Sequence, residues 1–269
     1  MPHENGSMIS SKELNLYYED YHALRDMFFE AEPGEMIGLI GPNGCGKSTL
    51  LRAINGLLKP SSGVMYVDGK DINKLNLSEI AKTCSNVPTE FPPDFNLNVI
   101  EVVMMGRYPH RKGLWWETDD DESIARDALS KFEITHLADR NINRLSSGER
   151  QRTLIAKAYV QEPRVMLIDE PTSHLDMRFK LEVMEYIRDL MRKEEDMTVV
   201  VASHDINLMV KYCDRIILVK EGHIVGIGTP DEIVTEKNIA DVYGVDCSIF
   251  RDSSGEVIVH PRCSLKFKS

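Results

Sequence analysis

The sequence predicts an α/β fold built around a parallel sheet, and two patterns support this. Short apolar runs are consistent with buried strands, at Met36–Ile40, Val165–Ile168, Val199–Ala202 and Ile216–Val219. They are apolar throughout rather than alternating, which is typical of parallel strands covered on both faces. Apolar residues with helical spacing lie between them, at Leu50, Leu51, Ile54 and Leu57 and again at Leu181, Met184, Ile187 and Met191. Strands that alternate with helices indicate an α/β core.

Composition narrows the class of protein. The 269 residues allow one large domain or two small ones. The 32 basic and 43 acidic residues leave a net charge of −11, which disfavours a nucleic-acid partner. The five cysteines are scattered, so we expect reduced thiols and neither a zinc site nor a disulfide framework. No apolar run approaches the roughly 20 residues of a membrane-spanning helix, and the N-terminus does not resemble a signal peptide; we therefore expect a cytosolic chain.

The alternation of strands and helices breaks in one internal region. Residues 90–143 contain helical patterns and no clear strand, so we interpret about residues 91–160 as a helical subdomain inserted in a main domain of residues 10–240. The acidic run Asp119–Glu122 favours a helix start, where carboxylates suit the helix dipole. Residues 241–269 are predicted to form a C-terminal extension with a β-hairpin, because two apolar runs flank Asp252–Gly255.

A glycine-rich loop follows the first apolar strand and precedes a helix. It fits the pattern G-x-x-x-x-G-K-[ST], with Gly41, Pro42, Asn43, Gly44, Cys45, Gly46, Lys47, Ser48 and Thr49 in order. Such a loop turns successive N–H groups toward phosphate oxygens, and the helix N-terminus adds partial positive charge. Lys47 is expected to reach the β- and γ-phosphates, and the Ser48 hydroxyl to ligate Mg²⁺. The pattern predicts a nucleotide site but not the use of the energy.

Two carboxylates end a later strand. Asp169 is placed to hold Mg²⁺, and Glu170 to orient or deprotonate an attacking water. The sequence Asp-Glu-Pro also suits a turn after a strand. In a chain with a phosphate-binding loop, the functional interpretation is favoured.

The segment before that strand carries a specific resemblance. It contains Leu145, Ser146, Ser147, Gly148 and Glu149. This resembles the LSGGQ signature motif of ATP-binding-cassette (ABC) ATPases, with departures at Ser147 and Glu149. The same residues fit a helix N-cap with Glu149 as the capping-box acid, and the two interpretations are compatible. The resemblance implies a RecA-like P-loop NTPase core, an N-terminal antiparallel β subdomain and an inserted helical subdomain. It also implies a homodimer in which the signature motif of one subunit contacts the γ-phosphate bound by the other.

Further landmarks of the family follow in order. Ser173 to Asp176 resembles the D-loop, which crosses to the opposite site. His204 resembles the switch histidine that touches the γ-phosphate, and Tyr18 stands where the family places the aromatic that stacks on adenine. Tyr17 is the neighbouring candidate, and a tyrosine of the core is the alternative for Tyr18.

One landmark departs from the family pattern. The loop that normally carries a metal-sensing glutamine has Thr89 at that position, followed by Glu90. Threonine is shorter and lacks the amide, so it acts through a water or is replaced in this role by Glu90, or the position tolerates change because Ser48 and Asp169 hold the metal. Our hypothesis is that hydrolysis survives and that coupling to the membrane partner is altered.

The segment Glu101–Pro109 sharpens the class. It resembles a stretch of the iron-siderophore, haem and cobalamin importer ATPases, as does the C-terminal hairpin. The resemblance implies ATP and Mg²⁺ as cofactors, and two integral membrane permease subunits that hold the homodimer at the cytoplasmic face of the cell membrane. An external substrate-binding protein is an indirect partner. We expect an ATPase for iron-siderophore import; haem, cobalamin and oxyanion import, a soluble ABC ATPase and a regulatory nucleotide-binding module are the alternatives.

Overall fold

The computed structural model describes residues 6–89, 91–92, 96–111, 119–173, 175–194 and 196–267. Glu90, offered above as a substitute for Thr89, lies outside these residues, and so does His174 of the D-loop segment. Across the described ranges, no helix combines the length and the apolar character needed to cross a membrane.

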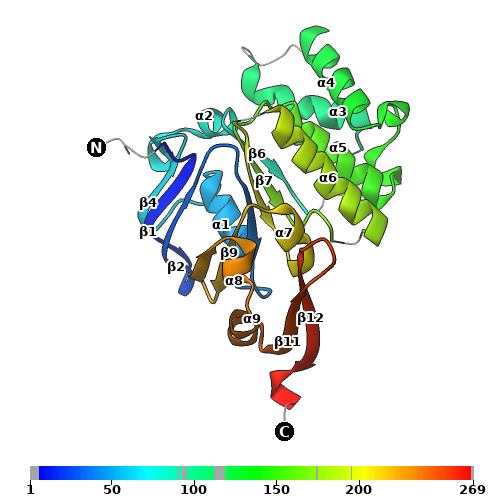
Figure 1. Cartoon of the computed structure of the whole chain (residues 1–269). Helices are drawn as coiled ribbons and strands as arrows, with labels where there is room; N and C mark the ends of the chain where they lie inside the picture. The colour runs from blue at the N-terminus through cyan, green and yellow to red at the C-terminus, as the bar shows by residue number, and fades with distance from the viewer. Residues whose placement is uncertain are drawn as a thin grey trace.

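A six-stranded sheet forms the centre of the molecule (Figure 1). Its strand order is β10-β9-β3-β8-β7-β6, and every neighbouring pair is parallel except β10 with β9. The strands are β3 (Met36–Ile40), β6 (Cys84–Val87), β7 (Val165–Asp169), β8 (Thr198–Ala202), β9 (Arg215–Lys220) and β10 (His223–Gly228). The four apolar runs of the sequence become the four adjacent strands β9, β3, β8 and β7. The expected α/β fold with a parallel sheet is therefore confirmed.

A second, antiparallel sheet of order β2-β1-β4-β5 contains the N-terminal strands. Its members are β1 (Ile9–Tyr18), β2 (Tyr21–Ala31), β4 (Ser62–Val67) and β5 (Lys70–Asp71). Helix α1 (Lys47–Ile54) shares a buried core with both sheets, in which Leu24 of β2 and Ile37 of β3 pack with Leu50. The N-terminal antiparallel β subdomain is thus present, and its packing fixes the start of α1 against the central sheet.

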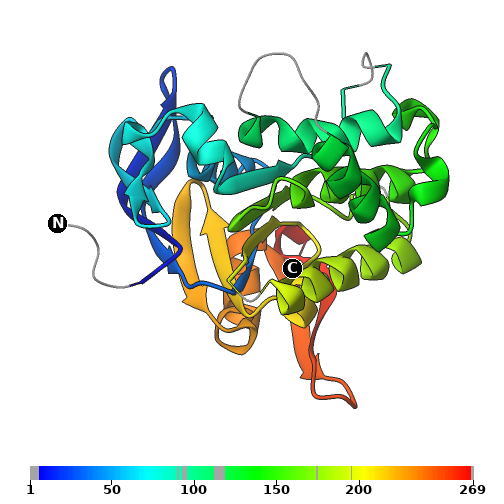
Figure 2. The same ribbon diagram turned by 90° about the horizontal axis from the view of Figure 1, so that it is seen from above.

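A group of helices lies on the other side of the central sheet (Figures 1 and 2). It comprises α3 (Val99–Met104), η2 (Met105–His110), α4 (Asp119–Lys131), η3 (Thr135–Leu137), η4 (Ile142–Arg144) and α5 (Ser147–Tyr159). We call these elements the helical lobe. Its described residues contain no strand, only an isolated bridge between Asn98 and Asn141. Phe132 and Leu154 of the lobe share one core with Ile187 and Val201 of the α/β part, so the lobe packs directly on the central domain.

Four further helices connect the strands of the core. η1 (Ile72–Lys74) and α2 (Leu77–Ala81) connect β5 to β6, while α6 (Met177–Lys193) and α7 (Ile206–Tyr212) follow β7 and β8. Each of α6 and α7 begins at an aspartate N-cap, Asp176 and Asp205 respectively. These caps fix the chain where it leaves the carboxyl ends of the two strands.

The C-terminal part contains the hairpin that the sequence indicates. It consists of α8 (Pro230–Ile233), α9 (Glu236–Tyr243), β11 (Val245–Arg251), β12 (Val257–Ser264) and η5 (Leu265–Phe267). The side-chain amide of Asn207 donates to Val259 O at 3.2 Å, and its oxygen accepts from Val259 N at 2.9 Å. The hairpin is therefore held on α7. The boundaries at residues 240 and 241 stay a prediction.

Candidate active site

The glycine-rich loop joins β3 to α1 and has an unusual backbone. Three glycines have positive φ, with 156° at Gly41, 78° at Gly44 and 110° at Gly46. At Gly41 a Cβ would lie 2.2 Å from the carbonyl oxygen of Val219, so only glycine fits. Gly46 caps α1 without a side-chain hydrogen bond, and the first turn carries no acidic residue. The N–H groups of this turn are consequently left for an anion.

Lys47 is a buried cation inside this loop. Its side chain donates through Nζ to Gly41 O at 2.8 Å and to Pro42 O at 3.3 Å, and the residue is 7% exposed. An ammonium group has three donors, so one remains for a ligand. A buried ammonium is costly without negative charge nearby, which favours an anionic ligand at this place.

Cys45 stabilises the loop and does not act as a nucleophile. The carbonyl of Cys45 accepts from Gly222 N at 3.0 Å, which ties the loop to the turn between β9 and β10. Burial raises the pKa of the Cys45 thiol, and the charge of Lys47 offsets this only in part. The thiol therefore stays protonated and serves packing.

A cavity of about 500 Å³ opens in front of the loop. Its lining joins the loop to the N-terminal sheet and to β7, and comprises Tyr21, Ala23, Asn43, Gly44, Gly46, Lys47, Ser48, Thr49 and Glu170. Glu170 reaches this cavity from more than a hundred residues away in the sequence because β3, β8 and β7 are adjacent and parallel. The carboxyl ends of parallel strands meet at one edge, where ligands of such sheets bind.

The aromatic residues of the β1–β2 turn lie near the same cavity. The hydroxyl of Tyr18 is 3.5 Å from Thr49 Oγ1, and the residue is 39% exposed. Tyr17 stacks on His22 with ring centroids 4.0 Å apart, so its ring already has a partner. Tyr21 was not predicted from the sequence, although it lines the cavity and is 58% exposed. Tyr21 lies three residues after Tyr18 and pairs with it across the turn, so its closeness to Tyr18 in the sequence could have indicated its place near the cavity.

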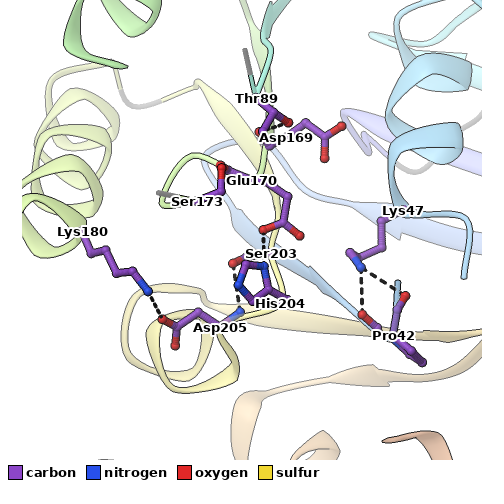
Figure 3. Close-up of polar contacts among 11 residues, drawn as sticks. Pro42, Lys47, Thr89, Asp169, Glu170, Ser173, Lys180, Ser203, His204 and Asp205 are labelled. Carbon is purple, nitrogen blue, oxygen red and sulfur yellow. Dashed lines mark hydrogen bonds and ion pairs between the residues drawn. The ribbon is translucent and has the colours of Figure 1, made fainter. Parts of the chain in front are cut away.

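Asp169 presents an unsatisfied oxygen at the end of β7. Its Oδ1 is buried and has no hydrogen-bond partner among the residues that the structure describes. The hydroxyl of Thr89, which follows β6, donates to the main-chain oxygen of Asp169 at 3.1 Å (Figure 3). Thr89 therefore contacts the backbone of the strand end rather than the carboxylate. A buried carboxylate oxygen without a donor requires a cation or a water.

Glu170 and His204 form the closest pair of ionisable groups at the strand ends. Glu170 Oε2 lies 2.6 Å from His204 Nδ1, and Figure 3 shows the carboxylate turned toward the ring. The Glu170 side chain is 18% exposed and the His204 side chain 57%. Glu170 is held through its own backbone, since its N–H donates to Ala202 O at 2.9 Å and its carbonyl accepts from Ser173 Oγ at 2.9 Å. A carboxylate fixed in this way can accept a proton from a water in the cavity.

The D-loop residues connect this pair to the following helix. Ser173 bonds Glu170, and Asp176 caps α6 by accepting from Phe179 N at 3.1 Å. A further contact absent from the sequence analysis joins Lys180 Nζ to Asp205 Oδ2 at 3.1 Å, next to His204. The ends of β7 and β8 are thus linked through α6.

The signature segment lies apart from the cavity. Ser146 is the N-cap of α5, its hydroxyl accepts from Glu149 N at 3.3 Å, and Glu149 Oε2 accepts from Ser146 N at 2.8 Å. The expected capping box is confirmed. Hydrogen bonding from the Ser146 hydroxyl lowers the pKa of Glu149. None of the residues from Leu145 to Glu149 lines the cavity at the phosphate loop.

A larger cavity lies elsewhere in the described part of the chain. It measures about 910 Å³ and is bordered by α4, the end of α5 and the segments before β7 and β8, with Lys131, Tyr159 and Glu194 on its wall. These segments are at the amino ends of the parallel strands, opposite the edge where such sheets bind ligands. The smaller cavity at the phosphate loop is therefore the candidate site.

Comparisons with known proteins agree with this geometry. The profile of the ABC transporter family matches residues 24–173. The ferric enterobactin transport ATP-binding protein of Escherichia coli is 36% identical over 260 residues, which cover 96% of this chain and 95% of that protein.

Two solved structures share the fold. A metal-chelate type ABC transporter in an inward-facing conformation gives a TM-score of 0.83 at 28% identity, over 96% of this chain and 98% of that one. A dimeric ATP-binding cassette in a post-hydrolysis state, bound to ADP and Pi, gives 0.72 at 29% identity, over 83% of this chain and 99% of that one. The chain belongs to the ABC transporter family and is an ABC-type ATPase.

Proposed function

We propose that this chain is the nucleotide-binding subunit of a membrane importer for iron-siderophore type metal chelates. The observation that carries the ATPase assignment is that the loop around Lys47 and the carboxylate of Glu170 line one cavity. The cargo class is supported by the ferric enterobactin relative and by the metal-chelate type structure. Two copies of the chain would pair with two permease subunits at the cytoplasmic face of the membrane, with an external substrate-binding protein delivering the cargo.

Nucleotide binding follows from the loop. The free donor of Lys47 and the N–H groups at the start of α1 bind the β- and γ-phosphates. Tyr18 supplies the ring that stacks on adenine, and Tyr21 is a second candidate from the same turn. Both rings are partly exposed, which suits a flat ligand that slides between the turn and the loop.

The residues at the strand end fit a bound Mg²⁺. Oxygen donors suit this ion, and it is usually bound by one or two protein groups together with substrate phosphates. The buried, unpartnered Oδ1 of Asp169 and the hydroxyl of Ser48 in the cavity wall are such donors. When bound, the ion supplies positive charge that offsets the charge on the phosphates.

Hydrolysis is assigned to Glu170. Its carboxylate accepts a proton from the attacking water, while His204 holds the carboxylate at Oε2 and leaves Oε1 for that water. Lys47 donates to the γ-phosphate and stabilises the charge that develops on it. The Glu170 backbone keeps the base in place during this step, because its N–H donates to Ala202 O and its carbonyl accepts from Ser173 Oγ.

The signature segment acts in a partner copy. Ser146, Ser147 and Gly148 begin α5 on a surface away from their own cavity, and a helix N-terminus binds phosphate well. In a head-to-tail homodimer this surface would contact the γ-phosphate held by the partner, with Ser173 and Asp176 near the crossing point. ATP then favours the closed dimer because its γ-phosphate is bound by both copies, and hydrolysis releases it. A dimeric relative bound to ADP and Pi supports this arrangement.

One experiment tests the function as a whole. The complex is purified from membranes through this subunit, the permease is identified, and ATPase activity is measured with binding proteins loaded with different cargoes. We expect a co-purified permease and stimulation by a ferric-siderophore-loaded binding protein. Stimulation by a cobalamin-, haem- or oxyanion-loaded protein instead would overturn the cargo, and ATPase activity with no permease partner would overturn the importer.

A further inference from the structure

We infer that Arg107 is a positioning residue for the signature motif, acting through a brace that runs along α5. The brace is formed by α3 and η2, residues 99–110, and it is tied to the chain at both ends of α5. This inference rests on the proposed function, in which the N-terminus of α5 meets ATP held by a second copy. It also gives a physical role to the Glu101–Pro109 segment. This segment resembles importer ATPases, but the resemblance does not say what the segment does.

The first tie is at the C-terminal end of α5. Arg107 Nη1 donates to Val160 O at 2.6 Å, its Nε donates to Asp121 Oδ1 of α4 at 3.1 Å, and Nη1 lies 3.2 Å from Glu162 Oε2. The Arg107 side chain is 8% exposed and that of Asp121 is 10% exposed. A buried guanidinium that joins three segments in this way has a single favourable geometry. Arg107 therefore fixes where the last turn of α5 lies relative to α4 and η2.

Gly106 and His110 strengthen the same end. A Cβ at Gly106 would lie 2.1 Å from Lys157 O, so the backbone of η2 packs directly on the last turn of α5. His110 Nε2 donates to Gln161 O at 2.8 Å. The Gln161 amide in turn donates to the carbonyl of Cys84, the first residue of β6, at 2.7 Å. The end of α5 is thus connected to the strand that leads to Thr89.

The second tie is just before the N-terminal end of α5. Val99 N and Ile100 N, at the start of α3, donate to Arg140 O and Ala138 O, each at 3.0 Å. Ile142 N donates to Leu97 O at 3.0 Å. The segment 138–144 runs directly into Leu145 and the N-cap Ser146, so the same brace holds the chain on both sides of α5.

The length of α5 explains why losing the Arg107 contacts at its C-terminal end would displace the signature motif at its N-terminal end. α5 has 13 residues and is therefore about 20 Å long. A tilt of about 5° at its C-terminal end would move its N-terminus by about 1.7 Å. Displacements of about 1 Å from remote changes can cost about 100-fold in a reaction that depends on positioning. Removing the Arg107 tie should consequently weaken the contact between α5 and a γ-phosphate held by another copy, and spare the phosphate loop.

The test measures ATP-driven dimerisation of the full chain in the Glu170→Gln background, in which we expect ATP to be bound but not hydrolysed. Sedimentation gives the protein concentration at half-dimerisation, and calorimetry gives ATP affinity of the monomer. We expect Arg107→Gln to raise the half-dimerisation concentration at least about tenfold and to leave ATP affinity within about twofold. Arg107→Lys, which keeps the charge but not the forked geometry, should be intermediate. Arg126→Gln is the matched control, since Arg126 lies on α4 and pairs with Glu122 at the surface.

Each outcome decides the inference. Dimerisation of Arg107→Gln at the concentration of the parent would overturn it, and so would a parallel loss of ATP affinity, which would indicate a general structural role. Should Arg107→Gln fail to fold, Arg107→Lys and Gly106→Ala apply the same test, because both residues belong to η2 and contact the end of α5. If the Glu170→Gln parent itself forms no dimer with ATP, the proposed dimer fails, and this inference is overturned with it.

Discussion

The cavity at the phosphate loop and the helical lobe are built in different ways. In the cavity, the loop from Gly41 to Thr49 is shaped by adjacent residues. Glu170 lines the same cavity because parallel strands end at one edge, where Asp169 precedes it and His204 pairs with it. In the lobe, the N-terminus of α5 depends on ties to Arg107 and to residues 138–142. The topology of the sheet thus positions the catalytic groups, whereas long-range packing positions the signature motif. Variants in the two regions should therefore fail in different steps.

The largest effect is expected at the cavity end, for Glu170→Gln. The amide cannot accept a proton, so the ATPase rate should fall at least about 100-fold while ATP affinity stays the same. Steady-state phosphate release and calorimetry measure the two quantities. Glu221→Gln is the control, because Glu221 has the same φ of 49° in an exposed turn. A near-normal ATPase rate in Glu170→Gln would show that Glu170 is not the catalytic base.

Lys47→Ala should affect the phosphate loop on the other side of the cavity. We expect it to weaken ATP binding and not only to slow hydrolysis. A hydrogen bond to a charged group contributes about 1.5–3 kcal/mol, so ATP affinity should fall about 10- to 100-fold. Lys59→Ala provides the control, since that lysine is exposed beyond the end of α1. Unchanged ATP affinity in Lys47→Ala would show that the buried ammonium serves the fold of the loop instead.

The contrast between the two regions also explains what could be predicted from the sequence. The loop and the residues at the strand ends are predictable because motif and strand end lie next to each other in the chain. The contact of Thr89 with the backbone of Asp169 is not, because it depends on how a loop leaves β6. Arg107 is the strongest case: a charged residue is expected at the surface, and its burial depends on Asp121 and on Val160, which are 14 and 53 residues away.

Thr89 follows β6 at the strand end that carries Asp169, where the chain continues toward the lobe. Thr89→Val removes the donor to Asp169 O, which is worth about 1 kcal/mol, and should raise the Mg²⁺ concentration at half-maximal ATP binding about fivefold. Thr89→Ser keeps the hydroxyl and should resemble the parent. Thr89→Gln, which restores the usual family residue, should change the ATPase rate or the transport yield per ATP. If Thr89→Val and Thr89→Gln both match the parent in every measurement, the position has no role in the site.

The smallest effect is expected in the lobe, at the capping box of α5. Glu149→Gln keeps the capping geometry, so stability at pH 7 should change by less than about 0.5 kcal/mol. The pH dependence should change instead. The folded pKa of Glu149 is lowered by the Ser146 hydroxyl, so its contribution is present above the unfolded pKa near 4.5 and is lost as pH falls through the lowered folded value. The melting temperature of the parent should therefore fall more between pH 6 and about pH 3 than that of Glu149→Gln.

Ser146→Ala identifies the source of that pH dependence. It removes the N-cap hydroxyl, which should cost about 1 kcal/mol at pH 7, and it removes the first cause of the lowered pKa of Glu149. In the Ser146→Ala background, adding Glu149→Gln should then change the pH profile of the melting temperature much less than in the parent. An equal change in both backgrounds would assign the acid sensitivity of Glu149 to the causes that remain, which are the backbone N–H of Ser146 and the charges of Arg140 and Arg152, rather than to the Ser146 hydroxyl. The ionisation of Glu149 in the first turn of α5 would then depend on the backbone of Ser146 and on charges of the lobe, and not on the N-cap hydroxyl.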